Sequence, residues 1–168
     1  MLRHLLIALV LVLFTLTSAL AEIVEGPLTD MVREAELIVI GTVVANERTG
    51  EKYISRLNGS KQEYTFYKAT IEVESILKGD PNMREITIYQ FNTSVDPTIH
   101  VGERDIFFIA KDPREFFKGR YSVVRGYAGM VRIVQDWVET HYIRGESKEQ
   151  KLEDFIHKIR DLVGKKAN

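Results

Sequence analysis

Asp96 and His100 are the residues whose types and spacing come closest to a chemical site. They lie four residues apart in a predicted loop over residues 92–103, together with Asn92 and Ser94. A carboxylate and an imidazole in one loop could bind a metal ion or assist hydrolysis. An Asp-Pro step and short polar side chains are also typical of turns, where such side chains bond their own backbone. We favour the turn interpretation and keep Asp96 and His100 as candidate ligand-binding residues.

Several other chemistries are excluded by residues that the chain lacks. None of the 168 residues is cysteine, which removes thiol nucleophiles, thiolate metal sites and disulfides. Beyond the first 21 residues three histidines remain, without the spacing of two ligands on one helix: His100, His141 and His157. The sequence has no nucleophile elbow, phosphate loop or dinucleotide fingerprint. It therefore predicts a protein without enzymatic activity, cofactor or metal site.

A polar stretch over residues 46–62 offers a second kind of site, one for recognition. Asn58-Gly59 is a tight-turn signal between two potential strands, so the stretch predicts a protruding hairpin. Tyr53 and Arg56 lie on it, and aromatic and basic side chains are enriched in binding interfaces. These two residues are therefore candidates for partner binding. Other aromatic residues are expected to complete the core: Tyr64, Phe66 and one of Phe116 and Phe117.

The elements that must position these residues are mainly β-strands. Residues 37–44 are apolar on both faces, as in a central strand buried on two sides, and Gly41 predicts a bend or bulge there. Residues 67–74 alternate between apolar and polar, which predicts a strand with one wet face. Further strands are expected at 86–89, 105–110, 121–125, 130–134 and 137–143. Their spacing is that of an antiparallel sandwich or barrel.

Helices are predicted at both ends of this β region. A short one spans residues 28–35, where apolar residues recur at helical spacing. A second covers about residues 148–163, because Ser147 and Gln150 match a capping box and Gly164 stands where a C-terminal cap belongs. One apolar stripe runs along it, formed by Leu152, Phe155, Ile156, Ile159, Leu162 and Val163. This amphipathic helix must bury its stripe, and we expect it to pack on the barrel.

The first 21 residues are typical of a signal peptide. Arg3 is followed by an apolar run over residues 5–16, and small residues precede a predicted cleavage between Ala21 and Glu22. An uncleaved anchor is the alternative, because the apolar segment just reaches membrane-spanning length. After cleavage, residues 22–168 are expected to form a single domain, without stable membrane insertion, in the periplasm or outside the cell. Their 22 basic and 24 acidic residues argue against nucleic acid as a partner.

The order of these elements resembles a known superfamily. The segments that carry the resemblance are Leu37–Val43, Ile76–Gly79, Ile86–Tyr89 and Val101–Ile109. Together they resemble the OB-fold domain of tissue inhibitors of metalloproteinases and netrin-like modules, and most of all the small exported bacterial proteins of that superfamily. The resemblance implies an antiparallel OB-like β-barrel over about residues 36–143, with contacts made by its loops. It does not imply zinc chelation, because the family's inhibitors use an N-terminal cysteine that this chain lacks.

We therefore predict an exported, non-enzymatic binding module of the cell envelope or the extracellular space. Residues 46–62 and 92–100 would form its contact surface for a protein or an envelope polymer. Two alternatives stay open at this point. One is a protease inhibitor that acts through these loops without zinc chelation, and the other is an envelope-polymer hydrolase with an unfamiliar site around Asp96 and His100.

Overall fold

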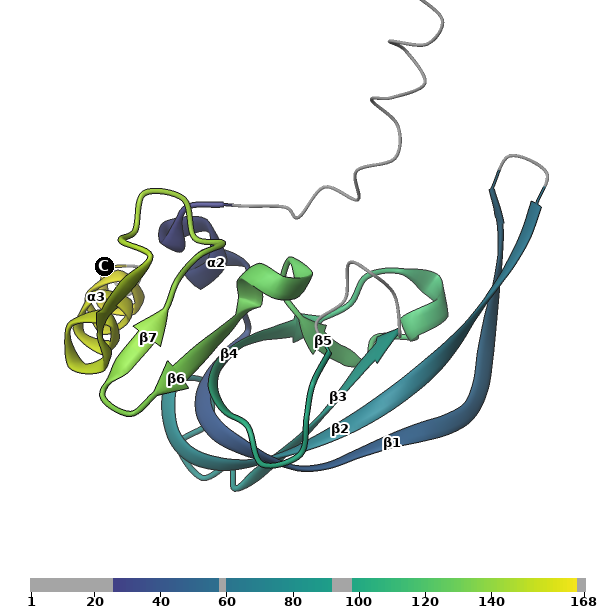
Figure 1. The fold of residues 1–168 in the computed structure, drawn as a ribbon, viewed down its shortest axis with the longest axis horizontal. Coiled ribbons are helices and arrows are strands. Elements are labelled where there is room, and N and C mark those ends of the chain that lie inside the picture. Colours follow the sequence, from purple (N-terminus) through teal and green to yellow (C-terminus); the bar gives the residue numbers. More distant parts are fainter. Residues whose placement is uncertain (1–25, 58–59, 92–97, 166–168) are drawn as a thin grey trace, which may run out of the picture.

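The computed structural model describes residues 26–57, 60–91 and 98–165 and, within these ranges, the side chains of all but residues 55–57 and 60. The described chain is mainly β, as predicted, and consists of one antiparallel sheet and two helices (Figure 1). The predicted signal peptide with its cleavage site, Ala21 and Glu22, lies outside the described residues.

Eight strands of the described chain form the sheet. They are β1 (Leu37–Leu57), β2 (Ser60–Lys78), β3 (Glu85–Phe91), β4 (Arg104–Lys111), β5 (Tyr121–Val123), β6 (Met130–Val134), β7 (Trp137–Glu139) and β8 (Glu149–Lys151). Hydrogen-bonded neighbours follow the order β3-β2-β1-β4-β6-β7-β8, and β5 pairs with β4 off this path. Among the described residues, no hydrogen-bonded pairing joins the two ends of this order. The sheet is therefore open.

The central position of β1 follows from its two apolar faces. β1 pairs with β2 on one side and with β4 on the other. Val39 is buried in one cluster of apolar side chains and Ile38 in another. The register with β2 shifts at Gly41, where an added Cβ would lie 2.5 Å from the backbone oxygen of Glu72. The predicted bulge is therefore confirmed, and it requires glycine because β2 approaches so closely.

Two apolar clusters share β1 and β4. The inner cluster lies on one face of the sheet and contains Leu37, Val39, Val43, Ala69, Ile71, Ile86, Ile88, Ile99, Phe107 and Ile109. The helix cluster lies on the other face of β1 and β4, where it joins Phe108 to Met31 of α2 (Leu28–Glu34) and to Phe155 of α3 (Leu152–Gly164). Figure 1 shows the two helices together at one end of the molecule. The prediction that the C-terminal helix buries its stripe is confirmed.

The C-terminal helix begins later than predicted. α3 starts at Leu152, and its N-cap residue makes no side-chain capping bond. The predicted capping box of Ser147 and Gln150 is wrong, because residues 149–151 form β8 and pair with β7. The carbonyl oxygen of Ser147 instead accepts a hydrogen bond from the hydroxyl of Thr140. Strand pairing with a neighbouring segment therefore outweighs a local helix signal at this point.

Two strands end earlier than predicted. β7 stops at Glu139 instead of residue 143, because the chain turns at Thr140, whose N–H donates to the carbonyl oxygen of Lys148 at 2.8 Å. β5 stops before Arg125, which has a left-handed φ of 55° and leads into the 3-10 helix η2 (Gly126–Gly129). A backbone in that region cannot continue a strand.

β1 and β2 continue past the rest of the sheet as a two-stranded ribbon. β4 pairs with β1 only as far as Thr42, and β3 pairs with β2 only from Phe66 onward. We call residues 46–57 and 60–65 the hairpin arm, and Figure 1 shows it projecting from the sheet. The predicted hairpin is confirmed, and its second strand runs on into the sheet without interruption.

Candidate functional site

An aromatic cluster lies at the base of the hairpin arm. Its rings come from β1, β2, β3 and the 3-10 helix η1 (Glu115–Phe117), and they are Tyr53, Tyr64, Phe66, Tyr89, Phe91, Phe116 and Phe117. Phe66, Phe91 and Phe117 are buried, while the other four rings are partly exposed. Phe66 and Phe117 thus complete a small core as expected, whereas Tyr64 keeps part of its ring at the surface.

Tyr53 is the central ring of the exposed layer. Its ring centre lies 4.2 Å from that of Phe116 and 5.9 Å from that of Phe91, in stacked arrangements. Tyr64 faces it across the arm at 6.4 Å, because the two residues are directly paired in the ladder. Stacked pairs of this kind contribute about 0.5–1.5 kcal/mol each beyond the burial of their area. Tyr53 therefore holds the arm against η1 and at the same time presents a ring to the outside.

Charged side chains frame the aromatic cluster. Glu51 of the arm accepts two hydrogen bonds from the guanidinium of Arg120, at 2.9 and 3.0 Å, and these bonds lower the pKa of Glu51. The same guanidinium lies 4.5 Å from the centre of the Tyr89 ring. The guanidinium of Arg114 lies 4.6 Å from the centre of the Phe117 ring. The arm is tied to the segment between β4 and β5 by an ion pair as well as by ring stacking.

The four binding residues expected from the sequence do not form one site. Tyr53 belongs to the aromatic cluster. Arg56 pairs with Lys61 in the ladder of the arm, and its side chain is not among those described. Asp96 lies outside the described residues. His100 is exposed and lines a separate cavity, and no residue of that cavity belongs to the aromatic cluster.

The cavity beside His100 has a volume of about 270 Å³ and an acidic lining. It is bounded by Thr98, His100, Glu103, Asp105, Tyr127, Met130, Arg132, Glu139, His141 and Tyr142. We call it the acidic cavity, because three carboxylates and one guanidinium line it. Strand register brings these groups together, since Arg132 of β6 pairs with Asp105 of β4 and with Glu139 of β7. The guanidinium of Arg132 donates to Glu103 at 2.7 Å.

Asp105 is the most deeply buried charged group of the acidic cavity. Only 2% of the residue is exposed, and its Oδ1 atom has no hydrogen-bond partner among the described residues. Burial, followed by the charge of Glu103, raises the pKa of Asp105 to about 6, against the lowering effect of Arg132 and of a backbone hydrogen bond from Ile133. A buried oxygen without a partner is an exception among the polar atoms of folded proteins.

Aromatic rings accompany the carboxylates of the acidic cavity. The ring centres of Tyr127 and Tyr142 lie 6.0 Å apart, at an angle of 46°. Within residues 26–57, 60–91 and 98–165, no three histidine or acidic side chains are placed so as to hold a metal ion. The cavity therefore offers carboxylate and aromatic groups to a ligand.

Of the residues that line the acidic cavity, sequence reasoning chose only His100 as a binding candidate and missed the carboxylates, although one signal pointed to them. Asp105 stands at the start of an otherwise apolar segment that was predicted to be a core strand over 105–110. A charged residue at such a position is almost never fully buried unless it has a function or a partner. The other charged members lie on later strands and meet Asp105 only through the register of the sheet.

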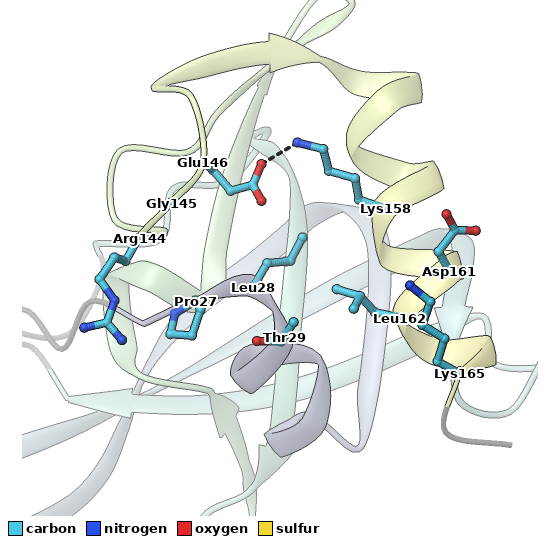
Figure 2. A pocket seen from close by; sticks show the side chains of 10 residues that line it. All are labelled: Pro27, Leu28, Thr29, Arg144, Gly145, Glu146, Lys158, Asp161, Leu162 and Lys165. Carbon is cyan, nitrogen blue, oxygen red and sulfur yellow. Dashed lines mark hydrogen bonds and ion pairs between the residues drawn. The ribbon is translucent and has the colours of Figure 1, made fainter. Parts of the chain in front are cut away.

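A second hollow, of about 290 Å³, lies between α2, α3 and the turn before β8 (Figure 2). Leu28 and Leu162 point into it. Glu146 on its rim accepts hydrogen bonds from Lys158 at 2.6 Å and from Gln150 at 3.0 Å. Burial alone would raise the pKa of Glu146, but these bonds outweigh it and the pKa is lowered. Because this carboxylate is already satisfied, the hollow is less suited to a charged ligand than the acidic cavity.

No helix of the described chain is long and apolar enough to cross a membrane.

Comparison with known proteins adds no family to these observations: no protein-family model matches the chain, and no curated protein matches it either.

Proposed function

We propose that the protein is a non-enzymatic binding module that holds a protein partner with its hairpin arm and aromatic cluster. The observation that carries this proposal is the stacking of Tyr53 on Phe116 at 4.2 Å, which leaves a layer of partly exposed rings at the base of the arm. Tyrosine and arginine are among the commonest residues at the energetic centres of protein interfaces. The aromatic cluster combines both, with Arg114 and Arg120 beside its rings.

The backbone of the arm favours a protein over a polymer as the partner. Within the arm, each strand has the other as its sole strand neighbour among the described residues. An edge strand with unpaired N–H and C=O groups can take up an extended segment of another protein as an added strand. Exposed charges along the arm, such as those of Glu47, Arg48 and Lys52, oppose indiscriminate pairing of these edges.

The arm is held in position before a partner arrives. The ion pair of Glu51 with Arg120 and the stack of Tyr53 on Phe116 both join it to the segment between β4 and β5. A surface that is fixed in advance loses less conformational entropy on binding. This arrangement supports a role in recognition for the arm.

An OB-like barrel is the architecture that we propose around this surface. β1, β2 and β3 follow one another as a meander, β4 returns to β1, and β5 pairs with β4 and lies beside β3. Closure between β3 and β5 would give the five-stranded order of an OB barrel. Side chains of β1, β2, β3 and β4 form the inner cluster, and the partly buried Tyr121 and Val123 of β5 pack against it. The proposed relationship to the tissue-inhibitor and netrin-like superfamily rests on this order and on the sequence resemblance.

The place of action that we propose is the cell envelope or the extracellular space. Its support is the sequence of residues 1–21, with a basic residue, an apolar run and small residues before the predicted cleavage site. A protease inhibitor and an envelope-polymer hydrolase are the competing functions, and the experiments below separate them.

Photo-crosslinking tests the arm as the contact surface. A photoreactive phenylalanine analogue replaces Ile54, which is 55% exposed on the arm, or, as a matched control, Trp137, which is 48% exposed on β7. The full chain is expressed in its native host, and crosslinked products are identified by mass spectrometry. We expect one protein partner to crosslink from position 54 and not from position 137. Purified wild-type protein should compete for this partner, and a folded Tyr53→Ala variant should not.

The competing outcomes are distinct. Equal crosslinking from both positions, or full competition by Tyr53→Ala, would refute the arm as the contact surface. A crosslinked glycan in place of a protein would assign the surface to polymer binding. Inhibition of metalloproteases or serine proteases by micromolar protein would favour the inhibitor, and release of soluble fragments from purified envelope polymer would favour the hydrolase.

A further inference from the structure

The acidic cavity has the composition of a site for an organic cation. Carboxylates from two strands and the loop before β4 line it together with two tyrosine rings. We propose that this cavity binds an alkylammonium group, carried by a small free amine or by a lysine side chain. The site is separate from the hairpin arm, and the proposal does not depend on the function proposed for the arm.

The charge balance inside the cavity favours a cation. Glu103 is already satisfied, since it accepts hydrogen bonds from Arg132 at 2.7 Å and from the backbone N–H of His100 at 3.1 Å. Asp105 and Glu139 form no ion pair within the described part of the chain. The guanidinium of Arg132 lowers the pKa of Asp105, but burial and the charges of Glu103 and Glu139 oppose it and the pKa stays raised. Three carboxylates thus share one guanidinium in this lining. A ligand with one positive charge would relieve their mutual repulsion and the desolvation of Asp105.

Asp105 supplies the strongest reason to expect a ligand. Its Oδ1 atom is buried without a hydrogen-bond partner, in a residue that is 2% exposed and that lines the cavity. Buried polar atoms without a partner are few in folded proteins. An ammonium N–H at this oxygen would form a charge-assisted hydrogen bond. Pairing with Gly41 on one side and Arg132 on the other fixes the backbone of Asp105 in the sheet, so the anchor is rigid.

The remaining lining fits the alkyl part and the outer face of the cation. The rings of Tyr127 and Tyr142 can attract an ammonium group over their faces, and Met130 offers an apolar contact. A volume of about 270 Å³ is below that of most drug-sized sites and suits a short alkyl chain. A divalent metal ion is a weaker fit, because no three acidic or histidine side chains of the described residues are placed to hold one.

An NMR titration of the ¹⁵N-labelled full chain at pH 7.5 tests the proposal. The probes are n-butylammonium, a lysine-containing tripeptide, and glutarate as an anion of similar length. Backbone amides of the residues that line the cavity should shift and saturate with butylammonium, with a Kd on the order of 1 mM for its five non-hydrogen atoms. Glutarate should give no saturable shift. Tighter binding of the peptide would assign the natural ligand to a protein, and tighter binding of the amine would assign it to a small molecule.

Three variants make the test specific. Asp105→Asn keeps the shape of the anchor without its charge and should weaken butylammonium binding by about tenfold or more. Glu85→Gln, at an exposed carboxylate on the edge strand β3, should leave the affinity within about twofold of the wild-type value. Tyr142→Leu should weaken binding roughly two- to fivefold, because it removes one ring face.

Several results would overturn the proposal. These are the absence of a saturable shift with either amine, an effect of glutarate as large as that of butylammonium, and an unchanged affinity in a folded Asp105→Asn variant. Saturable binding of Mn²⁺ at the same amides, with exclusion of the amine, would assign the cavity to a metal ion instead.

Discussion

Replacing Asp105 with asparagine is expected to make the protein more stable at neutral pH. In the folded chain, burial and the nearby charge of Glu103 raise the pKa of this carboxyl to about 6. Its ionisation is therefore harder in the folded chain than in the unfolded chain, where it is surrounded by water. Asparagine fills a similar volume and cannot ionise, so the variant avoids this destabilisation.

The size of the effect follows from the two pKa values of Asp105. The ordinary value of 3.8 and the folded value of about 6 differ by about two units, which corresponds to about 3 kcal/mol in the free energy of unfolding. Between these two pH values the folded state binds more protons than the unfolded state. Wild-type stability from this group is therefore lost as the pH rises from about 4 to about 6. The gain of the variant should be near zero at pH 4 and about 3 kcal/mol at pH 7.

Urea unfolding, followed by circular dichroism at several pH values, measures this gain. Asp112→Asn is a control of opposite sign. Burial alone would raise the pKa of Asp112, but hydrogen bonds from Arg114 outweigh it and lower the pKa. That variant should lose stability at neutral pH, and the loss should shrink in acid. A gain for Asp105→Asn that does not vary with pH, or a loss at pH 7, would refute the reasoning.

Three further substitutions test packing by urea unfolding. Phe155→Ala empties a fully buried position in α3 and should lower the free energy of unfolding by about 3–5 kcal/mol. As a control, replacement of the exposed His157 by alanine should change it by less than about 0.5 kcal/mol. Similar losses in the two variants would contradict the burial of the stripe. Gly41→Ala places a Cβ 2.5 Å from a neighbouring backbone oxygen and should destabilise by about 1–3 kcal/mol, while Gly50→Ala, with open space around it, should be near neutral. Equal effects at the two glycines would rule out the close approach at the bulge. Tyr53→Ala removes the central stacked ring and should lower the free energy of unfolding by about 1–3 kcal/mol. It should also speed amide hydrogen exchange in the hairpin arm. Unchanged exchange would show that the stack does not hold the arm.

Elements could be predicted from the sequence where the spacing of apolar residues along the segment shows which face is buried. Residues 37–44 are apolar on both faces, and β1 is indeed paired on both sides and buried between two clusters. The stripe of the C-terminal helix likewise gave its buried face correctly, with Phe155 and Ile159 in the core. In both cases the side chains that repeat along one face are the ones that the fold covers.

Elements that depend on a distant partner could not be predicted in this way. Ser147 and Gln150 fit a helix start, yet pairing with β7 makes the following residues a strand. Tyr53 could be chosen by its type, but its stack on Phe116 requires the turn of η1 to place that ring. The acidic cavity arises from the register of β4, β6 and β7, which no spacing along the sequence reveals.

The burial of β1 on both faces also bears on how long the nascent chain exposes apolar surface that could aggregate. β1 and β2 are adjacent in sequence, so they can pair without closing a long loop, and β4 can then cover the second edge of β1. A nascent chain that has not yet reached residue 152 still leaves the apolar face of Ile38, Ile40 and Phe108 without α3. Full protection of the earliest strand therefore depends on one of the latest elements, and part of this apolar face stays exposed until α3 docks.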